Sequence, residues 1–425
     1  MTKTSNDRMP QHARPAHDEN LQDTKSSHNG TTQHRKPAHD GKPQRKTAHD
    51  VIPQYIREID AYLPGKPVEE VERELGIRAI KLASNENPLG PSPLGVEAAK
   101  RALAEANRYP DGGSYYLREA LAKRLDVLRA NIVVGCGSTE LIHVAASVLL
   151  GPGESAVTSE GSFPLYYIAI EKMGAKLIAV PLENYAFDLD AMARAVEPET
   201  KLIYVANPNN PTGTVFDAEA FADFLAKVPE RVLVVMDEAY YEYVEMANYS
   251  RSIELVREGK NILVLRTFSK VYGLAGMRIG YGIGPAELLT EIDKIRLPIP
   301  VSGAAQAAAL AALDDFEHVR RSIETNREGL AQIEKGLREM GVRFVPSVTN
   351  FILVEVGEGA DALAEEMLKL GVIVRPMGWM GFPEAIRASV GTREENDAFL
   401  RALGQLQTSA GSPKRHGVGL VNERE

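Results

Sequence analysis

A lysine, an aspartate and a tyrosine stand directly after two apolar runs of the sequence. The run Val232–Met236 leads into Asp237 and Tyr240, and the run Ile262–Arg266 leads shortly into Lys270. A lysine amine in such a place can form a Schiff base with a carbonyl compound. A carboxylate at the end of an apolar strand is costly unless it meets a cation. The pattern therefore indicates a ligand site at the carboxyl ends of neighbouring strands.

Further polar groups follow the other apolar runs. Ser138 and Thr139 begin a predicted helix just after the run 131–135, where backbone amides and hydroxyls suit a phosphate group. Taken alone, this pattern is also typical of an ordinary helix cap. The rigid turn Asn-Pro-Asn-Asn-Pro-Thr-Gly at 207–213 presents the Asn210 amide, and Ser269 and Arg278 accompany Lys270.

One cofactor needs all of these groups. Pyridoxal phosphate requires a lysine for its aldehyde, an anion for its ring nitrogen, donors to its phenolate and a cationic phosphate cup. Phe163, after a predicted strand near 155–159, is the candidate to stack on its ring. Lys270 is the candidate for the aldehyde, Asp237 for the ring nitrogen, and Tyr240 with Asn210 for the phenolate. The candidates for the phosphate cup are Ser138, Thr139, Ser269 and Arg278.

Elements of alternating type must position these residues. Short β-rich runs at 131–135, 176–181, 201–206, 231–236, 261–266 and 278–283 are separated by segments of helical period. Strands that alternate with helices predict an α/β domain with a mostly parallel sheet flanked by helices. A single long helix over about 305–341, followed by shorter strands and helices, predicts a smaller α+β domain toward the C-terminus.

These patterns predict a division of the chain into five parts. Residues 1–50 and 408–425 are expected to be disordered tails, 51–85 an arm that joins the small domain, 86–304 the large cofactor-binding domain, and 305–407 the small domain. Residues 1–50 contain no Val, Ile, Phe, Tyr or Trp, and six of the nine histidines of the chain. Metal capture by these histidines is the alternative to a plain disordered tail, but their spacing is not that of zinc ligands, and no metal site is predicted.

Composition excludes several classes of protein. The chain has 425 residues and a net charge of −9, which argues against a nucleic-acid-binding protein. No apolar run reaches the length of a membrane span, so no membrane partner is expected. The single cysteine, Cys136, excludes a disulfide framework and fits a reducing compartment, so a cytoplasmic location is predicted.

Longer motifs give the sequence a family resemblance. They are Tyr-Leu-Pro-Gly-Lys-Pro-Val-Glu-Glu at 62–70, Lys-Leu-Ala-Ser-Asn-Glu-Asn-Pro at 81–88, Asn-Arg-Tyr-Pro-Asp at 107–111, the turn at 207–213, Asp-Glu-Ala-Tyr at 237–240, Ser-Lys at 269–270 with Arg278, and Ile-Arg-Ala-Ser-Val-Gly-Thr at 386–392. With them the chain resembles fold type I, aspartate-aminotransferase-like enzymes, and within these the histidinol-phosphate aminotransferase family. The resemblance covers roughly residues 62–405.

The resemblance implies an activity and additional site residues. It implies a ping-pong transamination between L-histidinol phosphate and 2-oxoglutarate in histidine biosynthesis, with Lys270 as the catalytic residue. It also implies that Thr267 contacts the cofactor phosphate and that Tyr109 reaches the cofactor of a second subunit in a homodimer. Substrate contacts are implied for Tyr62, Asn350, Arg375 and Arg387.

Departures from the family pattern keep other activities open. Pro300 and Ser302 stand where relatives often have amide side chains, and Trp379 and Phe382 precede Arg387. A phenylalanine or tyrosine aminotransferase would use the same cofactor residues, and these aromatic side chains favour a ring. A decarboxylase of a phospho-amino acid has a similar scaffold. A ligand-sensing module is the alternative from another class, but the intact Lys270 set disfavours it.

Overall fold

The computed structural model describes residues 48–62 and 65–409, and the side chains of 50–62 and 65–407. Contacts divide the chain into two units, Met1–Val51 and Ile52–Glu425. The described part of the first unit is one short 3-10 helix, η1 (Ala48–Val51). All other described elements belong to the second unit. The predictions for the histidine-rich tail and for 410–425 lie outside the described residues.

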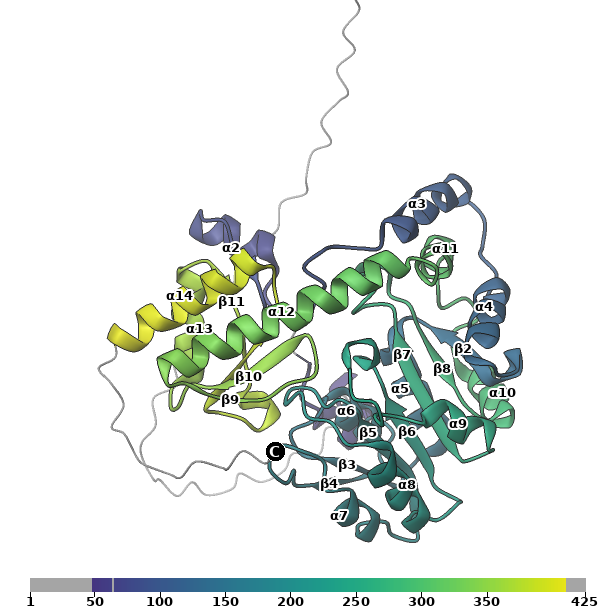
Figure 1. The fold of residues 1–425 in the computed structure, drawn as a ribbon. Helices are drawn as coiled ribbons and strands as arrows, with labels where there is room; N and C mark the ends of the chain where they lie inside the picture. The colour runs from purple at the N-terminus through teal and green to yellow at the C-terminus, as the bar shows by residue number, and fades with distance from the viewer. Residues whose placement is uncertain (1–47, 63–64, 410–425) are drawn as a thin grey trace, which may run out of the picture. The chain divides into compact units, whose positions relative to one another are not determined.

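A seven-stranded sheet forms the centre of the large domain (Figure 1). Its strand order is β2 (Ile132–Gly135), β8 (Gly280–Ile283), β7 (Ile262–Thr267), β6 (Leu233–Asp237), β5 (Thr200–Ala206), β3 (Ser155–Ser159) and β4 (Lys176–Val180). From β7 to β4 all neighbours are parallel, and β8 is antiparallel to both β2 and β7. The predicted mostly parallel sheet is confirmed.

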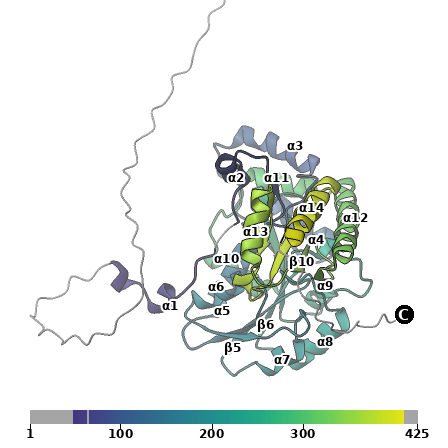
Figure 2. The same cartoon turned by 90° about the vertical axis from the view of Figure 1, so that its left-hand side faces the viewer.

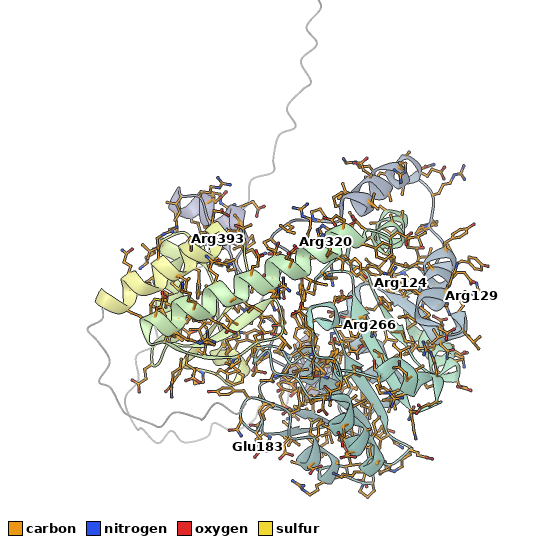
Figure 3. The ribbon with its side chains drawn as sticks, viewed as in Figure 1. Arg124, Arg129, Glu183, Arg266, Arg320 and Arg393 are labelled. Atoms are coloured by element: carbon orange, nitrogen blue, oxygen red, sulfur yellow. The ribbon has the colours of Figure 1, made fainter. Side chains whose placement is uncertain are left out.

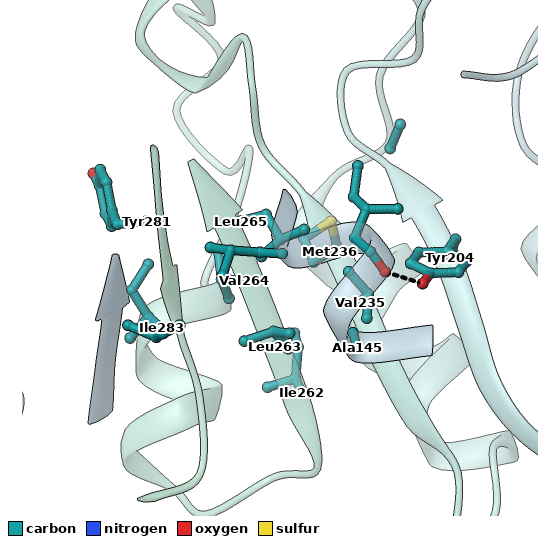
Figure 4. Packing of buried hydrophobic residues seen from close by; sticks show 14 of the residues in the cluster. Ala145, Tyr204, Val235, Met236, Ile262, Leu263, Val264, Leu265, Tyr281 and Ile283 are labelled. Carbon is teal, nitrogen blue, oxygen red and sulfur yellow. Dashed lines mark hydrogen bonds between the residues drawn. The ribbon is translucent and has the colours of Figure 1, made fainter. Parts of the chain in front are cut away.

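The middle strands are mostly apolar because both faces of the sheet are covered. The residues of β6, β7 and β8 are buried, with exposed fractions of 5 % or less for their apolar side chains, and Figure 4 shows side chains of these strands packed together. The dashed line in Figure 4 is the hydrogen bond that Tyr204 Oη donates to the Ile142 carbonyl, at 2.7 Å. This bond joins β5 to helix α5 (Gly137–Leu149), which also contacts β2, β7 and β8.

Further helices flank the sheet. They are α3 (Pro93–Ala102), α4 (Tyr115–Leu125), α6 (Leu165–Glu171), α7 (Leu189–Arg194), α8 (Ala218–Lys227), α9 (Ser252–Arg257) and α10 (Ala286–Ile295), with 3-10 helices η2 (Leu103–Glu105), η3 (Arg129–Asn131), η4 (Tyr241–Tyr243) and η5 (Ala275–Met277). No helix among residues 48–62 and 65–409 combines the length and the apolar character that a membrane span needs.

The small domain contains an antiparallel sheet. Its strand order is β12 (Arg375–Pro376), β13 (Ala385–Ser389), β10 (Phe351–Glu355) and β9 (Arg343–Val345). Helices α12 (Phe316–Met340), α13 (Ala360–Lys369) and α14 (Arg393–Ser409) lie side by side in Figure 2. A smaller α+β domain was expected here, and the structural relatives described below confirm the fold class.

The N-terminal segment of the second unit pairs with a strand from the C-terminal part of the chain. After α1 (Gln54–Arg57) and α2 (Val68–Leu75), the strand β1 (Ile80–Lys81) pairs in parallel with β11 (Val372–Ile373). Leu82 belongs to the hydrophobic cluster of the small domain. This pairing brings the residues that follow β1 against the small-domain sheet.

The expectation of one helix over 305–341 is wrong. The segment forms two helices, α11 (Gly303–Ala312) and α12, because Asp315 caps the second: its carboxylate accepts from the His318 backbone amide, at 3.3 Å, and from Ser92 Oγ, at 2.6 Å. The buried alanines of α11 pack into the core of the large domain. Helix α12 then runs from the large domain into the small one (Figure 1).

Candidate active site

A cavity of about 290 Å³ opens at the carboxyl ends of β5, β6 and β7. The start of α5, the segment 83–86 and residues of β12 and β13 complete its wall, so both domains contribute to it. All but two of the predicted site residues line it: Tyr62, Ser138, Thr139, Phe163, Asn210, Asp237, Tyr240, Thr267, Ser269, Lys270, Arg278, Arg375 and Arg387. The parallel strands end at one edge of the sheet, which is why residues distant in sequence meet there.

Lys270 lies in this cavity with its amine against two backbone carbonyls. Its Nζ is 3.3 Å from the oxygen of Ser84 and 3.4 Å from that of Asn85. Burial, and then the positive charge of Arg387, lower the pKa of Lys270 to about 8. A measurable fraction of the amine is therefore neutral near pH 7, as a nucleophile or base requires.

Asp237 ends β6 and is 5 % exposed. Its Oδ2 accepts a hydrogen bond from Tyr166 Oη, at 2.8 Å, and its Oδ1 accepts from the Ala239 amide, at 3.1 Å. Burial raises the pKa of Asp237 to about 6. Among the described residues no Lys, Arg or His forms an ion pair with it, so this buried carboxylate suits a cationic group of a ligand.

The start of α5 and Arg278 form a cradle for an anion. Gly137 has φ +74°, and a Cβ on it would lie 2.5 Å from Arg278 Nη2, so only glycine lets the guanidinium approach the helix start. Ser138 and Thr139 follow in the first turn. Across the cavity wall, Thr267 Oγ1 donates to Ser269 Oγ, at 2.9 Å. Backbone amides, hydroxyls and an arginine together are the groups that bind phosphate.

Asn210 and Tyr240 direct hydrogen-bond donors into the same space. Asn210 Oδ1 accepts from Arg387 Nη1, at 2.5 Å, which leaves the Asn210 amide group as a donor. Tyr240 Oη accepts from Asn85 Nδ2, at 2.9 Å, so its own proton is available to another acceptor. Burial raises the pKa of Tyr240 to about 12, which keeps this hydroxyl protonated.

Two predicted residues lie elsewhere. Asn350 is buried behind the cavity and donates from Nδ2 to the Asn85 carbonyl, at 3.0 Å. Tyr109 is 91 % exposed and does not line the cavity of its own chain. The resemblance assigned Tyr109 to a second subunit, which is not part of the structure.

Sequence reasoning missed two residues that hold the site together, Asn85 and Tyr166. Asn85, quoted in the motif at 81–88 without a role, bonds to Tyr240, and its Oδ1 accepts from Ser389 Oγ, at 3.1 Å. Its φ of +55° was a further signal that only the backbone reveals. Tyr166 contacts Asp237 from α6, a helix with no catalytic motif, so no sequence signal marked it.

The residues present fit pyridoxal phosphate. A reactive lysine, an unpaired buried carboxylate, two donors and an anion cradle converge on one cavity, in the arrangement that this cofactor requires. Within the described part of the chain, no group of three or more His, Cys, Asp or Glu side chains is placed so that it could hold a metal ion.

Comparison with known proteins identifies the class. Residues 77–403 match the family model of class I and II aminotransferases, and the chain belongs to that family. A curated "Histidinol-phosphate aminotransferase 1" of Nitrosococcus oceani is 46% identical over 349 residues, covering 82% of this chain and 94% of its own. "Histidinol-phosphate aminotransferase 2" of Ralstonia nicotianae is 47% identical over 357 residues, covering 83% and 96%.

A solved structure agrees with these sequences. The histidinol-phosphate aminotransferase of Sinorhizobium meliloti, crystallised in complex with pyridoxal-5'-phosphate, is 30% identical, with a TM-score of 0.79. The match covers 85% of this chain and 98% of that one. The predicted family, fold and enzyme class are thereby confirmed. As an aminotransferase, the chain acts on small-molecule amino donors and 2-oxo acids.

Proposed function

We propose that this chain binds pyridoxal phosphate and transfers the amino group of L-histidinol phosphate to 2-oxoglutarate in histidine biosynthesis. The products are imidazole-acetol phosphate and glutamate. One observation carries the proposal: Lys270, with its lowered pKa, and the buried Asp237 share one cavity, which Arg375 and Arg387 also line. The names of relatives at 46% and 47% identity support this substrate pair.

The cofactor would be held by residues of the large domain. Asp237, oriented by Tyr166, would pair with the protonated ring nitrogen, and Tyr240 and Asn210 would donate to the phenolate oxygen. Phe163 would lie against the ring. The phosphate would be bound by Ser138, Thr139, Thr267, Ser269 and Arg278. When bound, pyridoxal phosphate supplies a reactive aldehyde and an electron-withdrawing ring.

Lys270 would carry the proton transfer. Its neutral Nζ would remove the proton from the carbon that bears the amino group, and the resulting ammonium would give that proton up again within the same half-reaction. The lowered pKa keeps part of this amine neutral at working pH. The carbonyls of Ser84 and Asn85 hold the Nζ in place between these steps.

The anionic end of each substrate would meet the arginines of the small domain. Arg387 is fixed by Asn210 and by the Ala83 carbonyl, at 2.8 Å, so its guanidinium is preorganised. Arg375 and Tyr62 lie on the same cavity wall, and Asn350 supports it through Asn85. Both substrates carry phosphate or carboxylate groups, which guanidinium groups recognise.

A homodimer completes the proposal, with Tyr109 reaching the cofactor phosphate of the second subunit. Exposed apolar side chains within 94–116 and 297–299 support an interface: Leu94, Leu103, Tyr115, Tyr116, Leu297 and Ile299. Arg296 Nη2 donates to the Gly112 carbonyl, at 3.0 Å, which joins two of the segments that carry them. Co-expressing Y109A with K270A subunits tests this. In a mixed dimer, one site combines Lys270 of the Y109A subunit with Tyr109 of the K270A subunit and is intact, whereas neither variant alone forms an intact site.

Two other assignments accompany the proposal. We infer that the large and small domains meet within α12, since Val319 and Ile323 pack against one core and Ile333 and Leu337 belong to the other. This moves the expected boundary from residue 305 to the middle of that helix, and limited proteolysis of the cofactor-free protein tests it. Cytoplasmic location remains a prediction that cell fractionation tests.

Steady-state kinetics of the cofactor-loaded enzyme tests the reaction. We expect kcat/KM to be far higher for histidinol phosphate than for phenylalanine, with 2-oxoglutarate as acceptor. K270A, which keeps the cavity but lacks the amine, should lose the activity. A preference for phenylalanine would favour the aromatic aminotransferase, and carbon dioxide release without keto-acid turnover would favour the decarboxylase.

A further inference from the structure

The only tryptophan of the chain, Trp379, stands at the rim of the cavity. It lies in η6 (Gly378–Met380), directly after β12, and is 42 % exposed. Its Nε1–H donates to the Pro376 carbonyl, at 3.1 Å. Its polar atom is therefore satisfied within its own turn, and only its aromatic surface remains for other contacts.

That aromatic surface contacts Arg375. The guanidinium carbon of Arg375 lies 4.8 Å from the centre of the Trp379 ring, within the range of a cation–π interaction. The Tyr62 ring meets Trp379 edge-on, with centroids 5.6 Å apart and an interplanar angle of 80°. Two segments distant in sequence, Tyr62 and 375–379, thus meet at the Trp379 ring.

The segment that carries Trp379 is anchored on both sides. Met377 and Met380 are buried. Phe382 packs so closely on Gly161 of the large domain that a Cβ there would lie 2.6 Å from it. The Phe382 ring also stacks on Tyr185, with centroids 6.0 Å apart; Tyr185 belongs to the loop that Glu183 marks in Figure 3. These contacts fix the position of the segment that carries the indole.

Arg375 is placed beside a second arginine. Arg375 and Arg387 are direct partners in the register of β12 and β13, so their side chains leave the same face of the sheet. Burial, and the neighbouring charge of Arg375, lower the pKa of Arg387. Two guanidinium groups on one cavity wall repel each other unless an anion lies between them. A group with two negative charges satisfies both.

We propose that Trp379 is a positioning residue: it holds Arg375 beside Arg387, so that the two guanidinium groups receive the phosphate of a phosphorylated amino donor. The inference rests on the proposed function, in which Arg375 and Arg387 meet the anionic end of the substrate, and it adds the residue that positions Arg375. Arg375 covers part of the Trp379 ring, which reduces the surface that the indole can offer to the ring of a substrate. A phosphate monoester, with close to two charges at pH 7, matches the pair.

The first test compares two substrates that differ only in the phosphate. In W379L, which removes the aromatic face but keeps an apolar side chain, we expect KM for histidinol phosphate to rise about 2- to 5-fold, as for loss of a partly exposed cation–π contact. We expect kcat to change less than twofold and kcat/KM for histidinol to stay the same. W379F, which keeps a ring, should recover part of the loss. An equal effect on both substrates, or none, would overturn the proposal.

A double-mutant cycle tests whether Trp379 acts through Arg375. R375Q should reduce the preference for histidinol phosphate over histidinol more strongly than W379L does. In the R375Q background, W379L should reduce it no further, because the side chain it positions is gone. Additive effects of the two substitutions would contradict a positioning role.

Emission of the single tryptophan gives a readout that is independent of turnover. In the cofactor-loaded enzyme, glycerol 3-phosphate should change Trp379 emission with saturation, whereas glycerol should not, and R375Q should abolish the change. If the wild type shows this change but does not turn over histidinol phosphate, the proposed function fails and the phosphate receptor stands. Turnover of histidinol phosphate with no emission change would overturn the receptor alone.

Discussion

Asn85 is the side chain on which the geometry of the site depends most. Its Nδ2 donates to Tyr240 Oη at 2.9 Å, and its Oδ1 accepts from Ser389 Oγ at 3.1 Å. Its backbone amide donates to the same Ser389 Oγ, at 2.7 Å, and its carbonyl lies 3.4 Å from Lys270 Nζ. One residue thus joins the end of β6, strand β13 and the reactive lysine. The substitution N85A removes both side-chain bonds and leaves the backbone in place.

The expected loss of stability follows from these contacts. Each buried hydrogen bond contributes about 1 kcal/mol net. Asn85 also has φ +55°, where alanine costs about 1 kcal/mol more than asparagine. N85A should therefore lower the free energy of unfolding by about 3 kcal/mol. N85G removes the same bonds without the backbone cost and should lose about 1 kcal/mol less.

Urea unfolding of the cofactor-free protein, followed by circular dichroism, measures these differences. Asn184 provides a matched control because it also has a positive φ, +49°, but its side chain is exposed. N184A should cost only the backbone contribution, about 1 kcal/mol. If N85A is no more destabilising than N184A, the two side-chain bonds contribute nothing and Asn85 does not anchor the site.

Three further predictions concern the lysine, a buried ion pair and the phosphate cradle. The rate at which cofactor-free protein captures pyridoxal phosphate should rise with pH with a midpoint near pH 8, because burial lowers the pKa of Lys270 to about 8 and only its neutral amine reacts. Stopped-flow absorbance measures this rate, and a midpoint near 10.5 would contradict the assignment. E238Q should lower the free energy of unfolding by about 3–5 kcal/mol, because the fully buried Glu238 pairs with Arg266 (labelled in Figure 3) at 2.8 Å and accepts hydrogen bonds from two serines. The control E328Q, on the surface of α12, should lower it by less than about 0.5 kcal/mol, and equal losses would refute the role of the ion pair. G137A should weaken cofactor binding at least about tenfold in equilibrium dialysis, because the added Cβ would meet Arg278. G276A is the control, because a Cβ there has no atom within 4 Å, and wild-type cofactor affinity of G137A would exclude the anion cradle.

Much of the site could be predicted from sequence because it stands at strand ends. The runs before Asp237, Lys270 and Asn210 are mostly apolar, which marks buried parallel strands, and such strands end at a common edge. The chemistry of each residue then limits the ligand. This reasoning needs no knowledge of how distant segments pack.

What sequence could not reveal are contacts set by long-range pairing. The parallel pairing of β1 with β11 places Asn85 beside Tyr240 and Lys270, although the two strands lie far apart in the chain. Periodicity likewise did not locate the break before α12, where Asp315 caps the helix through the His318 amide and is also held by Ser92, 223 residues away in the chain. The neighbouring positions of Arg375 and Arg387 depend on the register of a two-residue strand.

The central claim is that this cavity moves an amino group from histidinol phosphate to a 2-oxo acid by way of the cofactor. A half-reaction tests it most directly: cofactor-loaded enzyme is mixed with histidinol phosphate in the absence of any oxo acid, and products are counted. We predict one imidazole-acetol phosphate per subunit, a change in the visible absorption of the cofactor, and its reversal by 2-oxoglutarate with one glutamate formed. No keto product from histidinol phosphate, or a product formed only when both substrates are present, would contradict the claim.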